Sequence, residues 1–223
     1  MIGQPVGWQP FEHRAAGYEA WYTTRRGRRA DLAERALIER LLAPFAEAQS
    51  ALEVGCGTGH FTRWMAGRLP RVIGLDRAPA MLAEAQRPRP RLLLIQGDAH
   101  HLPIRSRAVD LSVFVITLEF VEHPTVALAE AVRVARRGVL VVALNRWSLG
   151  GCSRRWGPGA RRPLVGRARD FTWLSLRALA FAAAGPRLRA LRWAGALFPG
   201  GPVGVAARIP FGDVIGIAVE LAP

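Results

Sequence analysis

The sequence predicts an α/β fold in which a mostly parallel sheet carries helices on both faces. Two observations support this class. Short apolar runs of strand length alternate along the chain with segments of helical periodicity. In addition, the apolar run Ala51 to Val54 leads into a glycine-rich turn, Gly55 to Gly59, and a helical pattern begins at Thr58. A glycine turn between a strand and a helix lets a polar or charged ligand approach the backbone closely.

The N-terminal part of the chain is expected to contribute helices. Phe11 to Tyr22 is rich in aromatic residues in a partly helical pattern, which fits either a lid over a bound ligand or ordinary core packing. Arg25 to Arg29 is a charge run broken by a glycine, and we interpret it as a solvated turn or as a contact for an acidic substrate. Asp31 to Leu42 has the apolar spacing of a helix.

The rest of the chain alternates between strands and helices, with one exception. Strands are expected at Ala51–Val54, Arg71–Asp76, Arg91–Ile95, Asp110–Ile116, Gly138–Leu144, Leu188–Leu197 and Val214–Leu221, and helices from Thr58 and at Pro79–Gln86, Pro124–Arg136 and Phe171–Ala184. The exception is Asn145 to Arg169, where tryptophans and arginines are interleaved. This stretch leaves the carboxyl end of the fifth strand, where open α/β sheets bind ligands. It is interpreted as a substrate-side lid, a solvated loop, or a contact for RNA or a lipid surface.

Composition limits the class of protein. The 223 residues suffice for one domain with a substantial core, and 50% of them are hydrophobic. The formal net charge of +14 would suit a polyanionic partner such as nucleic acid. Every basic residue is an arginine, however, and the chain has a single asparagine, a pattern that a GC-rich coding sequence would also produce. A nucleic-acid partner is therefore compatible with the charge but is not favoured.

The two cysteines and the hydropathy pattern indicate the compartment. Cys56 lies inside the glycine turn, where a disulfide to Cys152 would distort a ligand site, so we expect reduced thiols and a cytoplasmic protein. The N-terminus carries no basic-then-apolar signal, and no run approaches the ~18 apolar residues of a transmembrane helix. Histidines and acids lack the spacing of metal ligands, so no metal is expected. No pattern predicts the oligomeric state.

Acidic residues follow the predicted strands at the edge where ligands bind. The glycines read G-x-G-x-G from Gly55 to Gly59, one residue short of the G-x-G-x-x-G fingerprint, which disfavours a dinucleotide oxidoreductase. Asp76 ends the second strand about 20 residues further on, where a carboxylate can accept hydrogen bonds from both hydroxyls of a ribose. Asp98 follows the third strand, where the amino group of an adenine could donate to it.

Four ordered motifs carry a family resemblance from about Ala51 to Asn145, namely LEVGCGTG, VIGLDRAPAML, QGDAHHLP and VDLSVFVITLEFVEHP. Together they resemble the class I S-adenosylmethionine-dependent methyltransferases, most closely the type 11 branch of small single-domain enzymes. The resemblance implies a Rossmann-like three-layer sandwich whose seven-stranded sheet is mostly parallel with an antiparallel last strand. It also implies one domain over residues 1–223, with N-terminal cap helices (1–45), a cofactor-binding core (46–145), a basic and aromatic insert (146–170) and a C-terminal helix with the last strands (171–223).

The resemblance also implies S-adenosylmethionine as the cofactor and assigns its binding residues. The glycine turn would meet the methionine part, with Glu53 near the methionine amine. Asp76 would bind the ribose, and the start of the loop after the third strand would bind the adenine. The residues assigned to cofactor binding are Tyr22, Glu53, Gly55, Cys56, Gly57, Gly59, Asp76, Arg77, Met81, Asp98, Ala99, Thr117 and Leu118.

The implied reaction is an in-line displacement at the methyl carbon of the sulfonium, with a small molecule as the methyl acceptor. Such a reaction mainly needs alignment, so no dedicated catalytic residue is required. Glu119, which follows the fourth strand, is the best candidate for a general base, although a carboxylate on the surface or at the start of a helix fits the pattern equally well. Two alternatives stay open: RNA methylation, and a protein that binds S-adenosylmethionine without catalysis.

Overall fold

The computed structural model describes residues 7–87, 91–156 and 168–223. Within them, an eight-stranded sheet has the strand order β3-β2-β1-β4-β5-β8-β6-β7. The strands are β1 (Ser50–Val54), β2 (Arg71–Asp76), β3 (Leu93–Gln96), β4 (Val109–Val115), β5 (Ala135–Leu144), β6 (Leu188–Ala196), β7 (Ala206–Ala207) and β8 (Val214–Leu221). Strands β1 to β5 pair in parallel, whereas β8 is antiparallel to both β5 and β6. The predicted fold class, including the antiparallel last strand, is confirmed.

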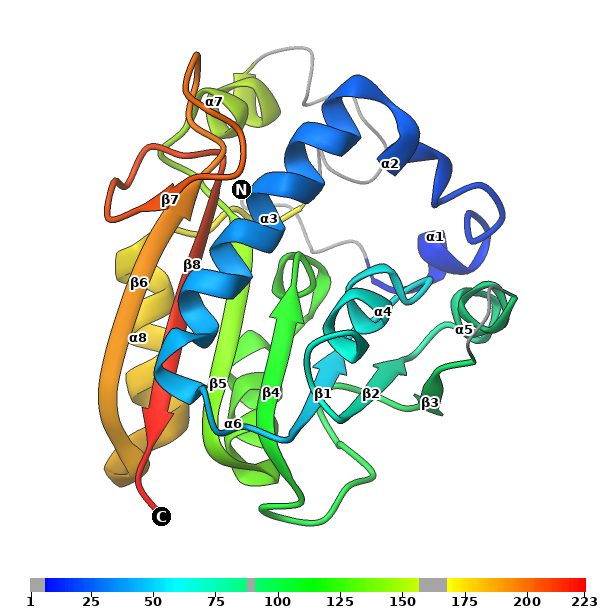
Figure 1. Ribbon diagram of the computed structural model, residues 1–223, viewed down its shortest axis with the longest axis vertical. Helices are drawn as coiled ribbons and strands as arrows, with labels where there is room; N and C mark the ends of the chain where they lie inside the picture. The colour runs from blue at the N-terminus through cyan, green and yellow to red at the C-terminus, as the bar shows by residue number, and fades with distance from the viewer. Residues whose placement is uncertain (1–6, 88–90, 157–167) are drawn as a thin grey trace.

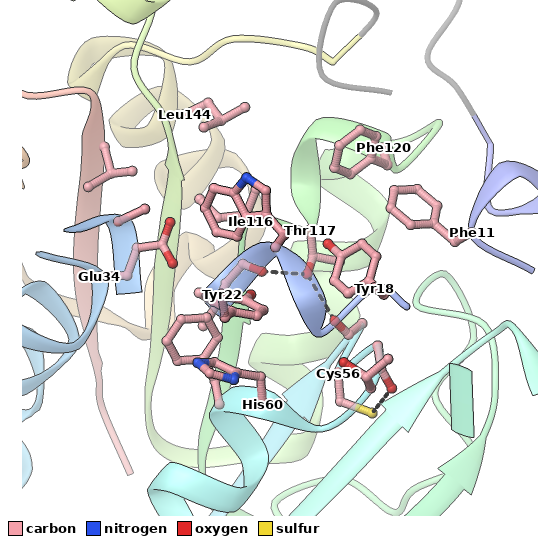
Figure 2. A pocket seen from close by; sticks show the side chains of 18 of the residues that line it. Phe11, Tyr18, Tyr22, Glu34, Cys56, His60, Ile116, Thr117, Phe120 and Leu144 are labelled. Atoms are coloured by element: carbon pink, nitrogen blue, oxygen red, sulfur yellow. Dashed lines mark hydrogen bonds between the residues drawn. The ribbon is translucent and has the colours of Figure 1, made fainter. Parts of the chain in front are cut away.

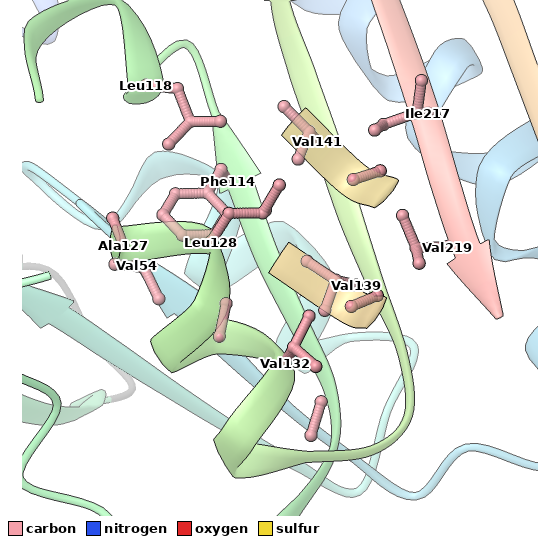
Figure 3. Close-up of a cluster of buried hydrophobic side chains, with 14 of the residues drawn as sticks. Val54, Phe114, Leu118, Ala127, Leu128, Val132, Val139, Val141, Ile217 and Val219 are labelled. Carbon is pink, nitrogen blue, oxygen red and sulfur yellow. The ribbon is translucent and has the colours of Figure 1, made fainter. Parts of the chain in front are cut away.

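Helices cover both faces of this sheet (Figure 1). The helices are α1 (Gln9–Glu12), α2 (Ala20–Thr23), α3 (Arg25–Leu42), α4 (His60–Ala66), α5 (Pro79–Gln86), α6 (Pro124–Val134), α7 (Leu149–Trp156) and α8 (Trp173–Ala184), with short 3-10 turns at η1 (Ala43–Phe45), η2 (Leu118–Phe120) and η5 (Gly185–Arg187). One core cluster packs α3 and α4 against one face of the sheet. A second cluster packs α6 and α8 against the opposite face, as Figure 3 shows for α6. The result is the expected three-layer arrangement.

The interpretation of Arg25 to Arg29 as a solvated turn is wrong. These residues form the first turns of α3, which the spacing of apolar residues had placed only from Asp31 onward. The side chain of Thr24 caps the helix by accepting a hydrogen bond from the Gly27 N–H at 3.0 Å. A β-carbon at Gly27 would lie 1.9 Å from the carbonyl oxygen of Trp21, so glycine allows α2 to pack closely on α3.

Other differences from the predicted elements are smaller. Strand β5 begins at Ala135, before the expected Gly138, because its pairing with β4 continues through a register shift. Strand β7 was not predicted, since two residues carry no periodicity. In the stretch after Asn145, the chain forms α7 and then returns to pair Phe171 with Asn145 as an isolated parallel bridge. The segment 157–167 of the predicted insert lies outside the described residues.

Candidate active site

A cavity of about 1550 Å³ opens beyond the carboxyl ends of the central strands. Its floor is the glycine turn after β1 together with residues that follow β2, β3 and β4, and its cover comes from α2 and the first half of α3 (Figure 2). The carboxyl end of a parallel sheet is where ligands bind in open α/β folds. The cavity is therefore the candidate active site.

The glycine turn has the backbone geometry that the sequence predicts. Gly55, Gly57 and Gly59 have φ values of +75°, +53° and +79°, a region that side chains with a β-carbon rarely occupy. A β-carbon at Gly55 would lie 2.2 Å from Cγ2 of Thr117. Gly59 is the N-cap of α4, so the turn ends at a helix N-terminus. The turn thus presents bare backbone to the cavity.

Asp76 is tied into this turn from the end of β2. Its Oδ2 accepts a hydrogen bond from the Gly57 N–H at 2.7 Å, and its Oδ1 accepts one from the Ala78 N–H at 2.9 Å. Burial raises the pKa of the Asp76 carboxyl, and the backbone hydrogen bonds oppose that shift. The carboxylate lines the cavity beside the glycines, where it can accept hydrogen bonds from a ligand's hydroxyl groups.

Two further predicted acids line the same cavity. Glu53 is buried, accepts a hydrogen bond from the hydroxyl of Thr62, and has a pKa that burial raises to about 8. Asp98 lies 3.3 Å from Nη1 of Arg77 and 2.7 Å from Nδ1 of His100. Burial acts to raise the pKa of Asp98, but the hydrogen bonds from His100 and the charge of Arg77 hold it below its ordinary value.

Tyr22 covers the cavity from α2 and is held there by a stack on His60. The two rings lie 3.7 Å apart at an interplanar angle of 4°. His60 Nε2 is 2.7 Å from Oδ1 of Asp31, and its Nδ1 is 3.4 Å from Oε2 of Glu19. Burial acts to lower the pKa of His60, but these two acids hold it above its ordinary value. The aromatic segment therefore forms part of the cavity wall, as the lid interpretation requires.

Eleven of the thirteen residues assigned to the cofactor line this one cavity. They are Tyr22, Glu53, Gly55, Cys56, Gly57, Asp76, Arg77, Met81, Asp98, Ala99 and Thr117. Gly59 is outside the lining but caps α4 at the end of the turn. Leu118 is fully buried among the residues that pack α6 on the sheet, so its side chain belongs to the core (Figure 3).

Glu119 is not on the surface and does not line the cavity. Its Oε1 accepts a hydrogen bond from the Leu144 N–H, and its Oε2 has no hydrogen-bond partner among the described residues. Burial raises the pKa of Glu119 to about 8. The carboxyl thus anchors η2 to the end of β5, and this position gives no support to its predicted role as a general base.

Sequence reasoning missed Glu34, which lies on α3 and lines the cavity. Its side chain points its carboxylate into the space that Tyr22, Ile116 and Leu144 border (Figure 2). Only 5% of the residue is exposed, and burial raises its pKa to about 8. A signal was present, because an acid interrupts the apolar face of α3 between Ala33 and Leu37.

The stretch after Asn145 also contributes to the cavity, through α7. Leu149, Gly150 and Arg154 line it, together with Val214 at the start of β8. Arg154 points inward, since its Nε donates to Oδ1 of Asp170 at 2.7 Å and its Nη2 donates to the Asn145 carbonyl at 3.0 Å. Arg25, Arg26 and Arg29 border the cavity as well.

Known proteins similar to this chain agree with this geometry. Residues 52–143 match the model of a family described as "Methyltransferase domain". A malonyl-[acyl-carrier protein] O-methyltransferase of Pectobacterium atrosepticum is 34% identical over 124 residues, which cover 53% of this chain and 48% of that protein. A demethylmenaquinone methyltransferase of Renibacterium salmoninarum is 38% identical over 96 residues, which cover 43% and 40%. The chain spans about half the length of these curated relatives.

Solved structures extend the likeness to the whole fold. A structure from Thermotoga maritima, titled an SAM-dependent methyltransferase and possible histamine N-methyltransferase, superposes with a TM-score of 0.81. It is 23% identical, and the match covers 96% of this chain and 98% of that one. Magnesium protoporphyrin IX methyltransferase from Synechocystis, solved with bound SAH, matches with a TM-score of 0.58 at 14% identity over 85% and 83% of the two chains. At these identities the structures show the fold alone. Residues 52–143, which include most of the cavity floor, are thus similar to a methyltransferase domain, and the whole fold is similar to that of solved S-adenosylmethionine-dependent methyltransferases.

Proposed function

We propose that the protein transfers a methyl group from S-adenosylmethionine to a small molecule bound in the same cavity. The observation that carries this proposal is the continuity of the cavity, which joins the glycine turn and its acids to an apolar and aromatic chamber under α2 and α3. Its volume of about 1550 Å³ exceeds the roughly 300–1,000 Å³ of sites that enclose one drug-sized ligand. Cofactor and acceptor therefore have room side by side.

The residues on the floor fit the cofactor. Positive φ angles at Gly55 and Gly57 leave a cradle that a β-carbon would fill, next to the carboxylate of Asp76. In the proposed arrangement this turn holds the methionine part, Asp76 holds the ribose hydroxyls, and Asp98 with Ala99 holds the adenine. When bound, S-adenosylmethionine supplies a methyl group that its positive sulfur has already activated.

The contribution of the chain is then to align the acceptor and exclude water. Orientation of two reactants can supply on the order of 7–11 kcal/mol of a displacement barrier. Tyr18 and Tyr22 close the chamber from above, and burial raises the pKa of the Tyr18 hydroxyl to about 12, so it stays neutral. Neutral aromatic faces also attract the positive charge that a sulfonium carries. The role of Glu119 as a base stays a prediction.

RNA as the acceptor has less support. The basic stretch after Asn145 was the reason to consider RNA, but its Arg154 is paired inside the protein with Asp170 and borders the cavity. The relatives named above act on chemically different acceptors according to their names, so they do not choose one for this chain. The salt dependence of acceptor binding distinguishes a small molecule from RNA, because contacts to phosphates make RNA affinity fall steeply as the salt concentration rises.

The experiment incubates the protein with methyl-labelled S-adenosylmethionine and a cell extract, then separates small molecules, lipids, RNA and proteins. We expect label in the small-molecule fraction, and none when the Asp76→Ala variant replaces the wild type. Label in RNA would replace this proposal by the RNA alternative. Cofactor binding without transfer of label to any fraction would favour the alternative of a non-catalytic binding protein.

A further inference from the structure

Glu34 is a buried carboxylate that has no partner among the residues that the structure describes. Among the described residues none forms a hydrogen bond or ion pair with it within the usual distance limits, although 95% of its surface is covered. Its helical neighbours Asp31 and Arg35 pair with each other instead, at 2.7 Å. Burying an ionisable group without a partner costs free energy, and because Glu34 lines the cavity, a ligand bound there could supply the missing partner.

The surroundings of Glu34 are apolar or negatively charged. Tyr22, Ile116 and Leu144 border the space into which its carboxylate points (Figure 2), and Val214 lines the same cavity. The charges that act on the Glu34 carboxyl are those of Asp31 on its own helix and Glu119 on η2, and both raise its pKa. The tyrosines that Glu34 influences, Tyr18 and Tyr22, are neutral because burial raises their pKa values. Within residues 7–87, 91–156 and 168–223, no positively charged side chain pairs with Glu34.

Resting on the proposed function, we infer that the acceptor chamber binds a molecule with a basic nitrogen, and that the Glu34 carboxylate pairs with this nitrogen in its protonated form. The aromatic ring of Tyr22 strengthens the same preference, since aromatic faces attract cations. Arg25, Arg26 and Arg29 also line the cavity, but Arg25 and Arg26 are exposed to solvent and Arg29 is half-buried. Water screens their charges far more than it screens a buried carboxylate.

Binding of an ammonium group must then release a proton. The pKa of Glu34 is about 8, so at neutral pH the empty site holds the carboxyl mostly protonated. A cation within hydrogen-bond distance favours the ionised form and lowers that pKa. Uptake of the cation at about pH 7 therefore expels the Glu34 proton to solvent, whereas a neutral ligand expels none.

The test uses the full chain loaded with S-adenosylhomocysteine and three probes that share one ring: phenethylamine, phenethyl alcohol and phenylacetate. Calorimetric titration in two buffers of different ionisation enthalpy gives both the affinity and the number of protons released. We expect phenethylamine to bind ~10- to 100-fold more tightly than the alcohol, the range for a hydrogen bond to a charged group. We also expect proton release with the amine alone.

Two variants test whether Glu34 causes the preference for the amine and the release of a proton. Glu34→Gln keeps the size of the side chain and should lose both the amine preference and the proton release. Glu39→Gln, on the same helix but in an exposed pair with Arg68, should keep both. The affinity for S-adenosylhomocysteine should not change in Glu34→Gln. If it falls, Glu34 belongs to the cofactor site and the inference is overturned.

Other results also overturn the inference. The inference fails if phenethylamine does not bind, or if the three probes bind with equal affinity. It also fails if phenylacetate binds most tightly, because the chamber would then bind an acid through the arginines. In the labelling experiment, a methylated product that passes through a cation exchanger near neutral pH would likewise contradict it. Amine selectivity without any methyl transfer would uphold the Glu34 site while refuting the proposed function.

Discussion

At the scale of residues, three glutamates stand out because the fold buries them without a cation. Glu34, Glu53 and Glu119 each have a pKa that burial raises to about 8. Between their ordinary pKa near 4.5 and about 8, the folded state holds protons that the unfolded state has lost. The free energy of unfolding must therefore fall as pH rises through this window.

We predict that the ligand-free protein loses stability from pH 5 to pH 8, by at most about 1.4 kcal/mol per pH unit for each of these carboxyls. Replacing Glu34 by Gln removes one of them, so the loss should be smaller in that variant, while Glu39→Gln should match the wild type. Urea unfolding at several pH values measures this. An identical pH dependence in Glu34→Gln and wild type would show that Glu34 ionises as an exposed acid does.

Asp76 supports a second prediction at this scale. Its carboxylate is expected to accept two hydrogen bonds from the ribose, each worth about 1.5–3 kcal/mol to a charged acceptor. Asp76→Ala should therefore weaken S-adenosylhomocysteine binding by about 100-fold or more, measured by calorimetry. Because Asp76 also holds the Gly57 and Ala78 N–H groups, Asp76→Asn should keep part of the affinity. Undiminished affinity in Asp76→Ala would remove the ribose role.

At the scale of elements, α3 is the helix that forms one wall of the proposed acceptor chamber. It begins with an arginine run, although positive charge at a helix N-terminus is unfavourable. The cap from Thr24 and the close packing of α2 at Gly27 compensate for this. Through this packing, α3 brings Glu34 to the chamber and its arginines to the rim.

Gly27→Ala should destabilise the protein by about 1–3 kcal/mol, the cost of overpacking a tight contact, because its β-carbon would overlap the Trp21 carbonyl. Denaturant unfolding measures the loss. Gly67→Ala is the matched control, since Gly67 follows α4 with φ −79° and its nearest neighbour would be 3.5 Å from a β-carbon. Equal stability of both variants would mean that α2 does not press on α3.

At the scale of the whole molecule, we expect cofactor binding to be coupled to folding, because the floor of the cavity draws residues from the ends of β1, β2 and β4 and from the loop that follows β3. A ligand at 100 times its dissociation constant adds about 2.7 kcal/mol to the free energy of unfolding. For a chain of this size that amount raises the melting temperature by about 5–10 °C. Scanning calorimetry with S-adenosylhomocysteine tests this. At the same concentration, a variant with 100-fold weaker binding gains only about 0.4 kcal/mol, so Asp76→Ala should show a rise of about 1 °C or less.

No helix within 7–87, 91–156 and 168–223 is both long and apolar enough to span a membrane. The sequence predicted the α/β class, the positions of the seven main strands along the chain and the glycine turn. It could do so because periodicity and turn chemistry are local properties that the chain carries wherever it folds. It also predicted that Asp76 and Asp98 would meet near the turn, since the ends of parallel strands lie at one edge.

What the sequence could not predict depends on contacts between distant segments. Leu118 and Glu119 follow β4 in the chain, but η2 turns both side chains into the interior instead of the cavity. Arg25 to Arg29 joined α3 because of a close contact with α2 that no spacing reveals. The sequence by itself thus determined the fold class and most of the residues that line the cavity around the glycine turn, while their role in cofactor binding stays a prediction. Only the tertiary structure showed that Glu34 lines the cavity, because burial and the packing of α3 depend on contacts between distant segments.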